Sequence, residues 1–152
     1  EKGTCDGIGG TVPNLDNPDK LFKSYIALSK AINSGLVKTA HDCSEGGVGV
    51  AIAEMCIGGR IGAKIDLDGT GDESLWARLW GESLGRIIIA ISPENEEKFL
   101  ETMSGNTTTY LGEVTESRLL TISDGYEEVI STNVQQMVDS WQGTLDMTGG
   151  EI

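Results

Sequence analysis

The feature that most constrains the fold is an apolar run from Val48 to Ile57, in which Glu54 is the one charged residue. Such a run is typical of a helix that is buried on more than one side. Gly58 and Gly59 follow and predict its end. Other helices and strands must therefore cover it, and a chain of 152 residues has room for one domain with a real core.

Helical and strand patterns alternate through the rest of the chain. Asp16, Asn17 and Pro18 open a predicted helix that ends at Gly35. Strands are expected at 36–40 and 62–68, and a continuous β-branched run at 85–92 predicts a central strand. Further helices are expected at 72–83, from Pro93 to about Met103, and at 133–141. The residues expected to face inward from the first helix are Leu21, Phe22, Tyr25, Ile26, Leu28 and Ile32; from the later ones, Leu75, Trp76, Leu79, Trp80, Phe99, Leu100 and Met103.

Two late strands, at 108–115 and 118–123, flank the short turn Glu116-Ser117 and predict a hairpin. Because a hairpin is antiparallel, the predicted class is α+β with a mixed sheet rather than a purely parallel α/β fold. We expect a loop-rich segment at 1–17, the domain at 18–142 and a flexible tail at 143–152.

Composition excludes several classes of function. The net charge of −13 disfavours nucleic acid and anionic membranes as partners, since both require Lys and Arg to neutralise phosphates. No apolar run approaches the roughly 20 residues that span a bilayer, and no signal peptide is visible. Cys5, Cys43 and Cys56 have no zinc-site spacing and suggest reduced thiols. We therefore expect a cytoplasmic domain.

Most of the groups capable of chemistry gather between the strand at 36–40 and the buried helix. His41, Asp42, Ser44, Gly46 and Gly47 belong to the segment "HDCSEGG". Backbone N–H groups at such a helix start can hold a phosphate, and the glycines would let it approach. Asp42, with the neighbouring Glu45, offers ligands for Mg²⁺. The same pattern also suits a purely structural connection in which Ser44 caps the helix, and spacing alone leaves both interpretations open.

A second candidate segment, "GESLGR", precedes the β-branched strand. Arg86 can hold a phosphate or pair with Glu82, and a solvent-facing turn is the alternative. The Gly-rich "CDGIGGT" at 5–11 lacks the Lys-Ser/Thr of a phosphate-binding loop.

Taken in order, "AHDCSEGGVGVAIAEM", "GGRIGAKIDLD", "GESLGRIIIAI" and "LGEVTES" resemble the C-terminal lobe of phosphoribosylformylglycinamidine synthase. That family shares a superfamily with aminoimidazole ribonucleotide synthetase, selenophosphate synthetase, thiamine-monophosphate kinase and a hydrogenase maturation factor. The resemblance runs from about Ile8 to Trp141. It implies a three-layer α/β/α lobe that pairs with an N-terminal ATP-binding lobe.

The resemblance also implies an ATP-dependent carbon–nitrogen ligase of purine biosynthesis. Its substrate would be formylglycinamide ribonucleotide, its cofactors ATP and Mg²⁺ bound mainly by the N-terminal lobe, and its ammonia source a glutaminase domain or subunit. A fragment without the ATP-binding lobe is expected to be inactive alone.

Carried across by motif, the turn at 41–47 matches the family's ligand-facing turn, and Glu82 and Ser83 match a Glu-Ser-Gln segment that contacts the ribonucleotide. Leu84 stands where that segment has Gln. Since the full synthase contains two such lobes, this departure leaves open a non-catalytic scaffold lobe, and a sister ATP-dependent family is a further alternative.

Overall fold

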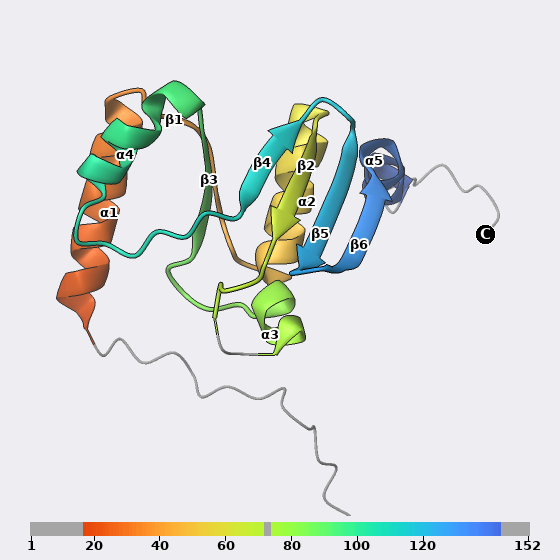
Figure 1. Cartoon of the computed structure of the whole chain (residues 1–152), viewed down its shortest axis with the longest axis horizontal. Helices are drawn as coiled ribbons and strands as arrows, with labels where there is room; N and C mark the ends of the chain where they lie inside the picture. Colours follow the sequence, from red (N-terminus) through yellow and green to blue (C-terminus); the bar gives the residue numbers. More distant parts are fainter. Residues whose placement is uncertain (1–16, 72–73, 144–152) are drawn as a thin grey trace, which may run out of the picture. The chain divides into compact units, whose positions relative to one another are not determined.

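The computed structural model describes residues 17–71 and 74–143, which fall into two compact units. Unit 1 contains the chain up to Ala51 together with Trp76–Tyr110. Unit 2 contains Ile52–Leu75 and the chain from Leu111 onward. Figure 1 shows the elements of both units along the chain. The expected Gly-rich loop at 5–11 and the tail after Gly143 lie outside the described residues.

Unit 1 is built from helices and two strands. It holds α1, β1, the start of α2, most of α3, β3, the short 3₁₀ helix η1 and α4. Their bounds are α1 Pro18–Asn33, β1 Val37–Asp42, α2 Gly47–Gly59, α3 Leu75–Trp80, β3 Ile87–Ile91, η1 Pro93–Asn95 and α4 Glu96–Thr102. α1 begins where expected, because the Asn17 side chain accepts a hydrogen bond from the Lys20 N–H and Pro18 occupies the first turn.

The core of unit 1 packs small residues of α1 against large residues of α4. Ala27 and Ala31 are buried together with Leu36, Phe99 and Met103. The Ser24 hydroxyl also donates to Asn106 Oδ1 at 2.8 Å, just beyond α4. α4 therefore packs on the side of α1 that carries Ala27 and Ala31, where the large Phe99 of α4 fits against these small residues.

This arrangement corrects the predicted inward face of α1. Leu21 and Leu28 are half-buried, whereas the remaining predicted core residues of that helix are exposed, Phe22 to 64%. Leu100 on α4 and Trp76 on α3 are exposed as well, and Trp80, which packs on Gly49, is 39% exposed. Leu79, Phe99 and Met103 are buried as predicted. For α1 the periodicity located the helix but not its covered side, since alanines carry little hydrophobic weight in such a pattern.

The β-branched strand β3 is not central among the described residues. It pairs with β1 alone, antiparallel, with Asp42 opposite Ile87 and His41 opposite Ile88. All residues of β3 are half-buried rather than buried. The prediction of a central strand is therefore wrong for this part of the chain, because only β1 supplies a neighbouring backbone.

Unit 2 is organised around a four-stranded sheet with the order β4-β2-β5-β6. Its elements are β2 Gly62–Asp66, β4 Gly112–Thr115, β5 Leu119–Asp124, β6 Glu127–Asn133 and α5 Val134–Gly143, with the end of α2. β2 alternates as predicted, with Ala63, Ile65 and Leu67 buried. β2 runs parallel to β5, and the other pairs are antiparallel. The predicted α+β class with a mixed sheet is thereby confirmed (Figure 1).

The predicted hairpin between the two late strands is wrong. β2 lies between β4 and β5, so these two strands do not bond to each other. The hairpin is instead formed by β5 and β6, and β6 was not predicted. β6 is followed directly by α5, which packs against it. No helix in the described part of the chain is long and apolar enough to cross a membrane.

Candidate functional site

The segment expected to be a turn begins as a strand. β1 continues through His41 and Asp42, and the Cys43 N–H then donates to the Arg86 carbonyl at 3.0 Å. His41 Nδ1 lies 2.7 Å from the Asp42 carbonyl oxygen and 3.9 Å from Asp42 Oδ1. Both residues are thus held in register by β3 rather than by a flexible loop.

The polar turn that follows is held by bonds within itself. The Ser44 hydroxyl donates to Asp42 Oδ2, and the Gly47 N–H donates to the Ser44 carbonyl at 3.0 Å. The Ser44 hydrogen bond is the main reason that the pKa of the Asp42 carboxyl lies below its ordinary value; the Asp42 backbone and His41 act in the same direction. Asp42 is therefore an ionised carboxylate near neutral pH.

The two glycines of the turn contact protein, not open space. The Gly46 N–H donates to Glu82 Oε1 at 3.0 Å. A Cβ added to Gly47, whose φ is +62°, would lie 2.7 Å from the Gly81 carbonyl oxygen and 2.8 Å from that of Leu79. Gly47 is therefore required by the close approach of the turn to the end of α3. Glu82 joins the two candidate segments by accepting the Gly46 hydrogen bond.

Arg86 faces the end of α3. Its Nη2 donates to the Gly81 carbonyl, and its Nη1 lies 3.5 Å from the Arg78 carbonyl oxygen. A cation at this position satisfies carbonyl groups that have no partner within the helix. Residues 82–85 of this turn are exposed, as the solvent-facing alternative predicts, whereas Arg86 itself is half-buried. The hydrogen bonds of Arg86 go to backbone carbonyls and not to Glu82.

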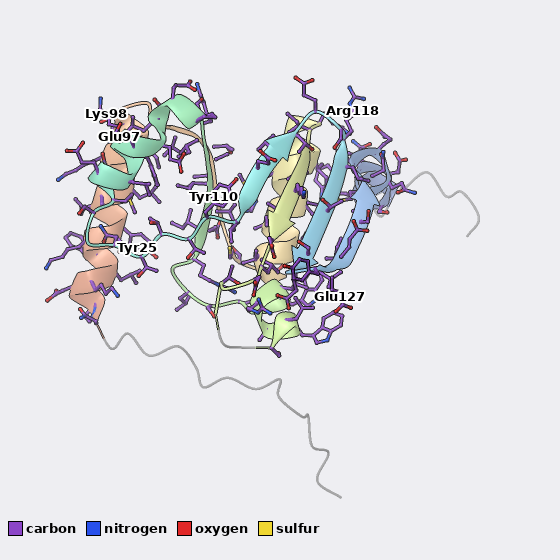
Figure 2. All side chains as sticks on the ribbon, viewed as in Figure 1. Tyr25, Glu97, Lys98, Tyr110, Arg118 and Glu127 are labelled. Atoms are coloured by element: carbon purple, nitrogen blue, oxygen red, sulfur yellow. The ribbon has the colours of Figure 1, made fainter. Side chains whose placement is uncertain are left out.

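These segments surround a pocket of about 400 Å³, all of it within unit 1. Its lining includes the polar residues Asp42, Ser44, Glu45 and Glu82. Tyr25, Leu84, Gly85 and Ile87 add apolar surface, and Arg86 and Cys43 complete the lining. Figure 2 labels Tyr25 on α1. A pocket of this volume suits a small organic ligand.

The predicted site residues divide into two groups. Asp42, Ser44, Glu45, Glu82 and Arg86 line the pocket. The other candidates, His41, Gly46, Gly47 and Ser83, are not among its lining residues. Ser83 is exposed, and the two glycines support the turn.

Sequence reasoning missed the apolar part of the pocket lining. Tyr25 was expected on the inward face of α1, in the core. Leu84 was noted only because it replaces the Gln of the family's Glu-Ser-Gln segment. Gly85, beside Leu84, lies close to α1: a Cβ there would lie 2.9 Å from Leu21 Cδ1 and 3.7 Å from the Tyr25 hydroxyl oxygen. The only signal of this approach in the sequence was the glycine itself, which here adopts a φ of +83°.

The Cys43 thiol and the carboxylates are the groups of the site capable of nucleophile or metal chemistry. Burial raises the pKa of the Cys43 thiol, so it stays protonated near neutral pH and makes a poor nucleophile. Within the described residues no group of three or more His, Cys, Asp or Glu side chains could hold a metal ion. Because Mg²⁺ is commonly held by only one or two carboxylates together with waters and substrate phosphates, Asp42 and Glu45 stay a prediction as its ligands.

Comparison with known proteins places this architecture in a family. The family described as "AIR synthase related protein, C-terminal domain" matches residues 2–125. The chain belongs to this family.

Solved structures agree with that assignment. Phosphoribosylformylglycinamidine synthase II from Thermotoga maritima is 26% identical with a TM-score of 0.69, covering 78% of this chain and 21% of that one. T. maritima PurL complexed with FGAR is 26% identical with a TM-score of 0.71, covering 80% and 21%. A HypE–HypF complex matches at 22% identity and a TM-score of 0.56, covering 70% and 39%, and shares the fold. The chain thus spans about a fifth of the synthase structures that it matches.

Proposed function

We propose that this chain is the C-terminal lobe of a phosphoribosylformylglycinamidine synthase and that its pocket contributes to the substrate site. The observation that carries the proposal is the meeting of segments 41–47 and 82–86 at one pocket, joined by the Gly46–Glu82 hydrogen bond. Similarity to a synthase crystallised with FGAR supports the same substrate, formylglycinamide ribonucleotide.

The reaction proposed for the full-length protein consumes ATP, which is a substrate. The formamide oxygen attacks the γ-phosphorus and ADP leaves, so the oxygen becomes part of a phosphate leaving group. Ammonia then adds to the same carbon, and phosphate departs to give the amidine. An amide carbonyl is otherwise a poor electrophile, and positioned groups lower the barrier by holding the reactants together.

Within this scheme the pocket residues of this chain bind and orient the ribonucleotide. Asp42 accepts from Ser44, and Glu82 supports the turn as a positioning residue. The ATP-binding lobe, the Mg²⁺ that accompanies ATP and the glutaminase that supplies ammonia belong to the rest of the proposed cytoplasmic enzyme.

A non-catalytic scaffold lobe is the second candidate, and specific contacts favour it. The Gly46 N–H is already bonded to Glu82, and backbone carbonyls fill the space beside Gly47. Leu84 also replaces the Gln of the family motif. Under this alternative the turn would stabilise the lobe without touching substrate.

The test follows ADP release by the full-length protein with Mg-ATP, free ammonia and formylglycinamide ribonucleotide. Ser44→Ala is expected to lower kcat/KM about tenfold or more while the protein stays folded, because the Asp42 carboxylate loses its orienting hydroxyl. Ser104→Ala, an exposed serine at the end of α4, is the matched control.

Three outcomes separate the alternatives. Ribonucleotide-dependent ADP release that Ser44→Ala impairs supports a working substrate site. ADP release that depends on the ribonucleotide and is equally fast in the Ser44→Ala variant supports the scaffold alternative. ADP release that is the same with and without the ribonucleotide contradicts the synthase assignment and favours a sister ATP-dependent family.

A further inference from the structure

Most of the donors that the sequence predicted for a phosphate are already engaged inside unit 1, although the buried Nε of Arg86 has no hydrogen-bond partner among the described residues. The Gly46 N–H bonds to Glu82, and the Ser44 hydroxyl bonds to Asp42. Arg86, the one cation that lines the pocket, directs its two terminal nitrogens at backbone carbonyls of α3. A phosphate entering this pocket would have to compete with these bonds for the same donors.

The charge of the lining opposes an anion as well. Three carboxylates, those of Asp42, Glu45 and Glu82, stand beside the single guanidinium of Arg86. Carboxylates only accept hydrogen bonds, so they suit a ligand that presents hydroxyl or N–H donors. A phosphate dianion would meet like charges at short range.

The apolar part of the pocket lining suits the carbon skeleton of a ring. Tyr25 is 42% exposed and Leu84 70% exposed, so both offer apolar surface to a ligand. Ile87 continues this surface on β3. Gly85 packs closely on Leu21 and lies near the Tyr25 hydroxyl, so the turn and α1 approach each other here. Aromatic side chains combine a large contact area with few rotatable bonds.

We propose that this pocket holds the uncharged, hydroxyl-bearing sugar ring of the ligand, with the phosphate directed out of it. Tyr25 and Leu84 contact the ring carbons, and the carboxylates of Asp42 and Glu45 accept hydrogen bonds from the hydroxyl groups. This inference rests on the proposed function, because it assigns the part of a ribonucleotide that unit 1 recognises.

The experiment measures Kd for formylglycinamide ribonucleotide and for its phosphate-free ribonucleoside with the full-length protein. Tyr25→Ala is expected to weaken both ligands by the same factor, about tenfold or 1.4 kcal/mol, because the ring carbons lose the contact area of the aromatic side chain. Glu45→Gln is expected to weaken both several-fold. The controls are Tyr110→Ala and Glu97→Gln, exposed residues of unit 1 outside the pocket lining (Figure 2).

The direction in which Glu45→Gln changes the Kd of the ribonucleotide shows whether the sugar or the phosphate occupies the pocket. If the phosphate lay in the pocket, removing a negative charge would tighten the ribonucleotide and leave the ribonucleoside unchanged, which would overturn the inference. Normal turnover with no effect of either variant would also overturn it while leaving the proposed function intact. If the wild-type protein binds no ribonucleotide, the proposed function fails and the inference with it.

Discussion

Units 1 and 2 bury their strands to different depths. In unit 2, β2 and β5 alternate between exposed and buried positions, and Ile122 at the centre of β5 is 0% exposed. In unit 1, every residue of β3 is only half-buried, although its sequence is the more apolar. The difference follows from the number of strands, because a two-stranded ladder cannot cover its own faces and edges.

The pocket lies in unit 1, the unit whose strands are less buried. A binding site needs exposed side chains and partly open backbone, and such regions are commonly the less stable parts of a protein. In unit 1 the shape of the turn depends on a few contacts, namely the Gly46–Glu82 bond, the Gly47 approach to α3 and the Arg86 bonds. Unit 2 depends instead on side chains packed on a sheet.

The largest expected effect tests this contrast directly with two isoleucines on strands. Ile122→Ala in unit 2 should lower the free energy of unfolding by about 4 kcal/mol, because it leaves a cavity at a fully buried site. Ile88→Ala in the half-buried β3 should cost about 1 kcal/mol. Urea denaturation of the two variants measures both values. Equal losses would break the comparison and indicate that a part of the protein beyond the described residues covers β3.

A smaller effect is expected from filling the space at the turn. Gly47→Ala should lower the free energy of unfolding by about 3 kcal/mol, since it combines a positive φ with a clash against backbone carbonyls. Gly35→Ala is the matched control: its φ is +72°, but nothing lies within 4 Å of the added Cβ, and about 1 kcal/mol is expected. Similar losses measured in urea would mean that the turn can move away from α3.

The smallest expected effect is a pH-dependent change in the free energy of unfolding, compared between variants of Asp66 and Asp42. Asp66 Oδ1 accepts from the N–H groups of Asp68 at 2.9 Å and Gly125 at 3.0 Å, which lowers the pKa of the Asp66 carboxyl. Because the folded-state pKa lies below the unfolded one, the stabilisation is full above the ordinary aspartate pKa and is lost as pH falls through the lowered value. Asp66→Asn should therefore destabilise unit 2 at neutral pH and become equal to wild type in acid.

Asp42→Asn provides the comparison in unit 1. The side-chain partner of Asp42, Ser44, is only two residues away, whereas Asp66 ties β2 to the hairpin of β5 and β6. The pH-dependent part of the unfolding free energy, measured between neutral and acidic pH, should be smaller for Asp42→Asn. A larger effect at Asp42 would show that its short-range bond matters more to the fold than the tertiary one.

Local sequence signals predicted most elements but not their neighbours. Asn17 and Pro18 marked the start of α1, and the alternation in "GAKIDLD" gave the buried face of β2. The hairpin was assigned to β4 and β5 because a short turn joins them, yet β2 separates these strands. Strand order depends on contacts between distant segments, which a turn signal does not contain.

For the candidate site, the sequence identified the residue types and not their partners. Asp42, Ser44, Glu45, Glu82 and Arg86 were expected at a site and do line one pocket. Nothing in the spacing showed that Glu82 accepts from Gly46, a bond across 36 positions of the chain. Tyr25 was equally hidden, because an aromatic residue on an amphipathic helix has the same pattern in a core as in a pocket wall.

By itself, then, the sequence determined the helices and most strands, the α+β class and the polar segment at the end of β1, because caps, glycines and hydrophobic periodicity act over a few residues. Only the tertiary structure decided which face of α1 is covered, which strands pair and which donors remain for a ligand. Packing against α4 buries the alanine side of α1. The Gly46 N–H and Arg86, which the sequence predicted as phosphate ligands, bond to Glu82 and to the Gly81 carbonyl instead.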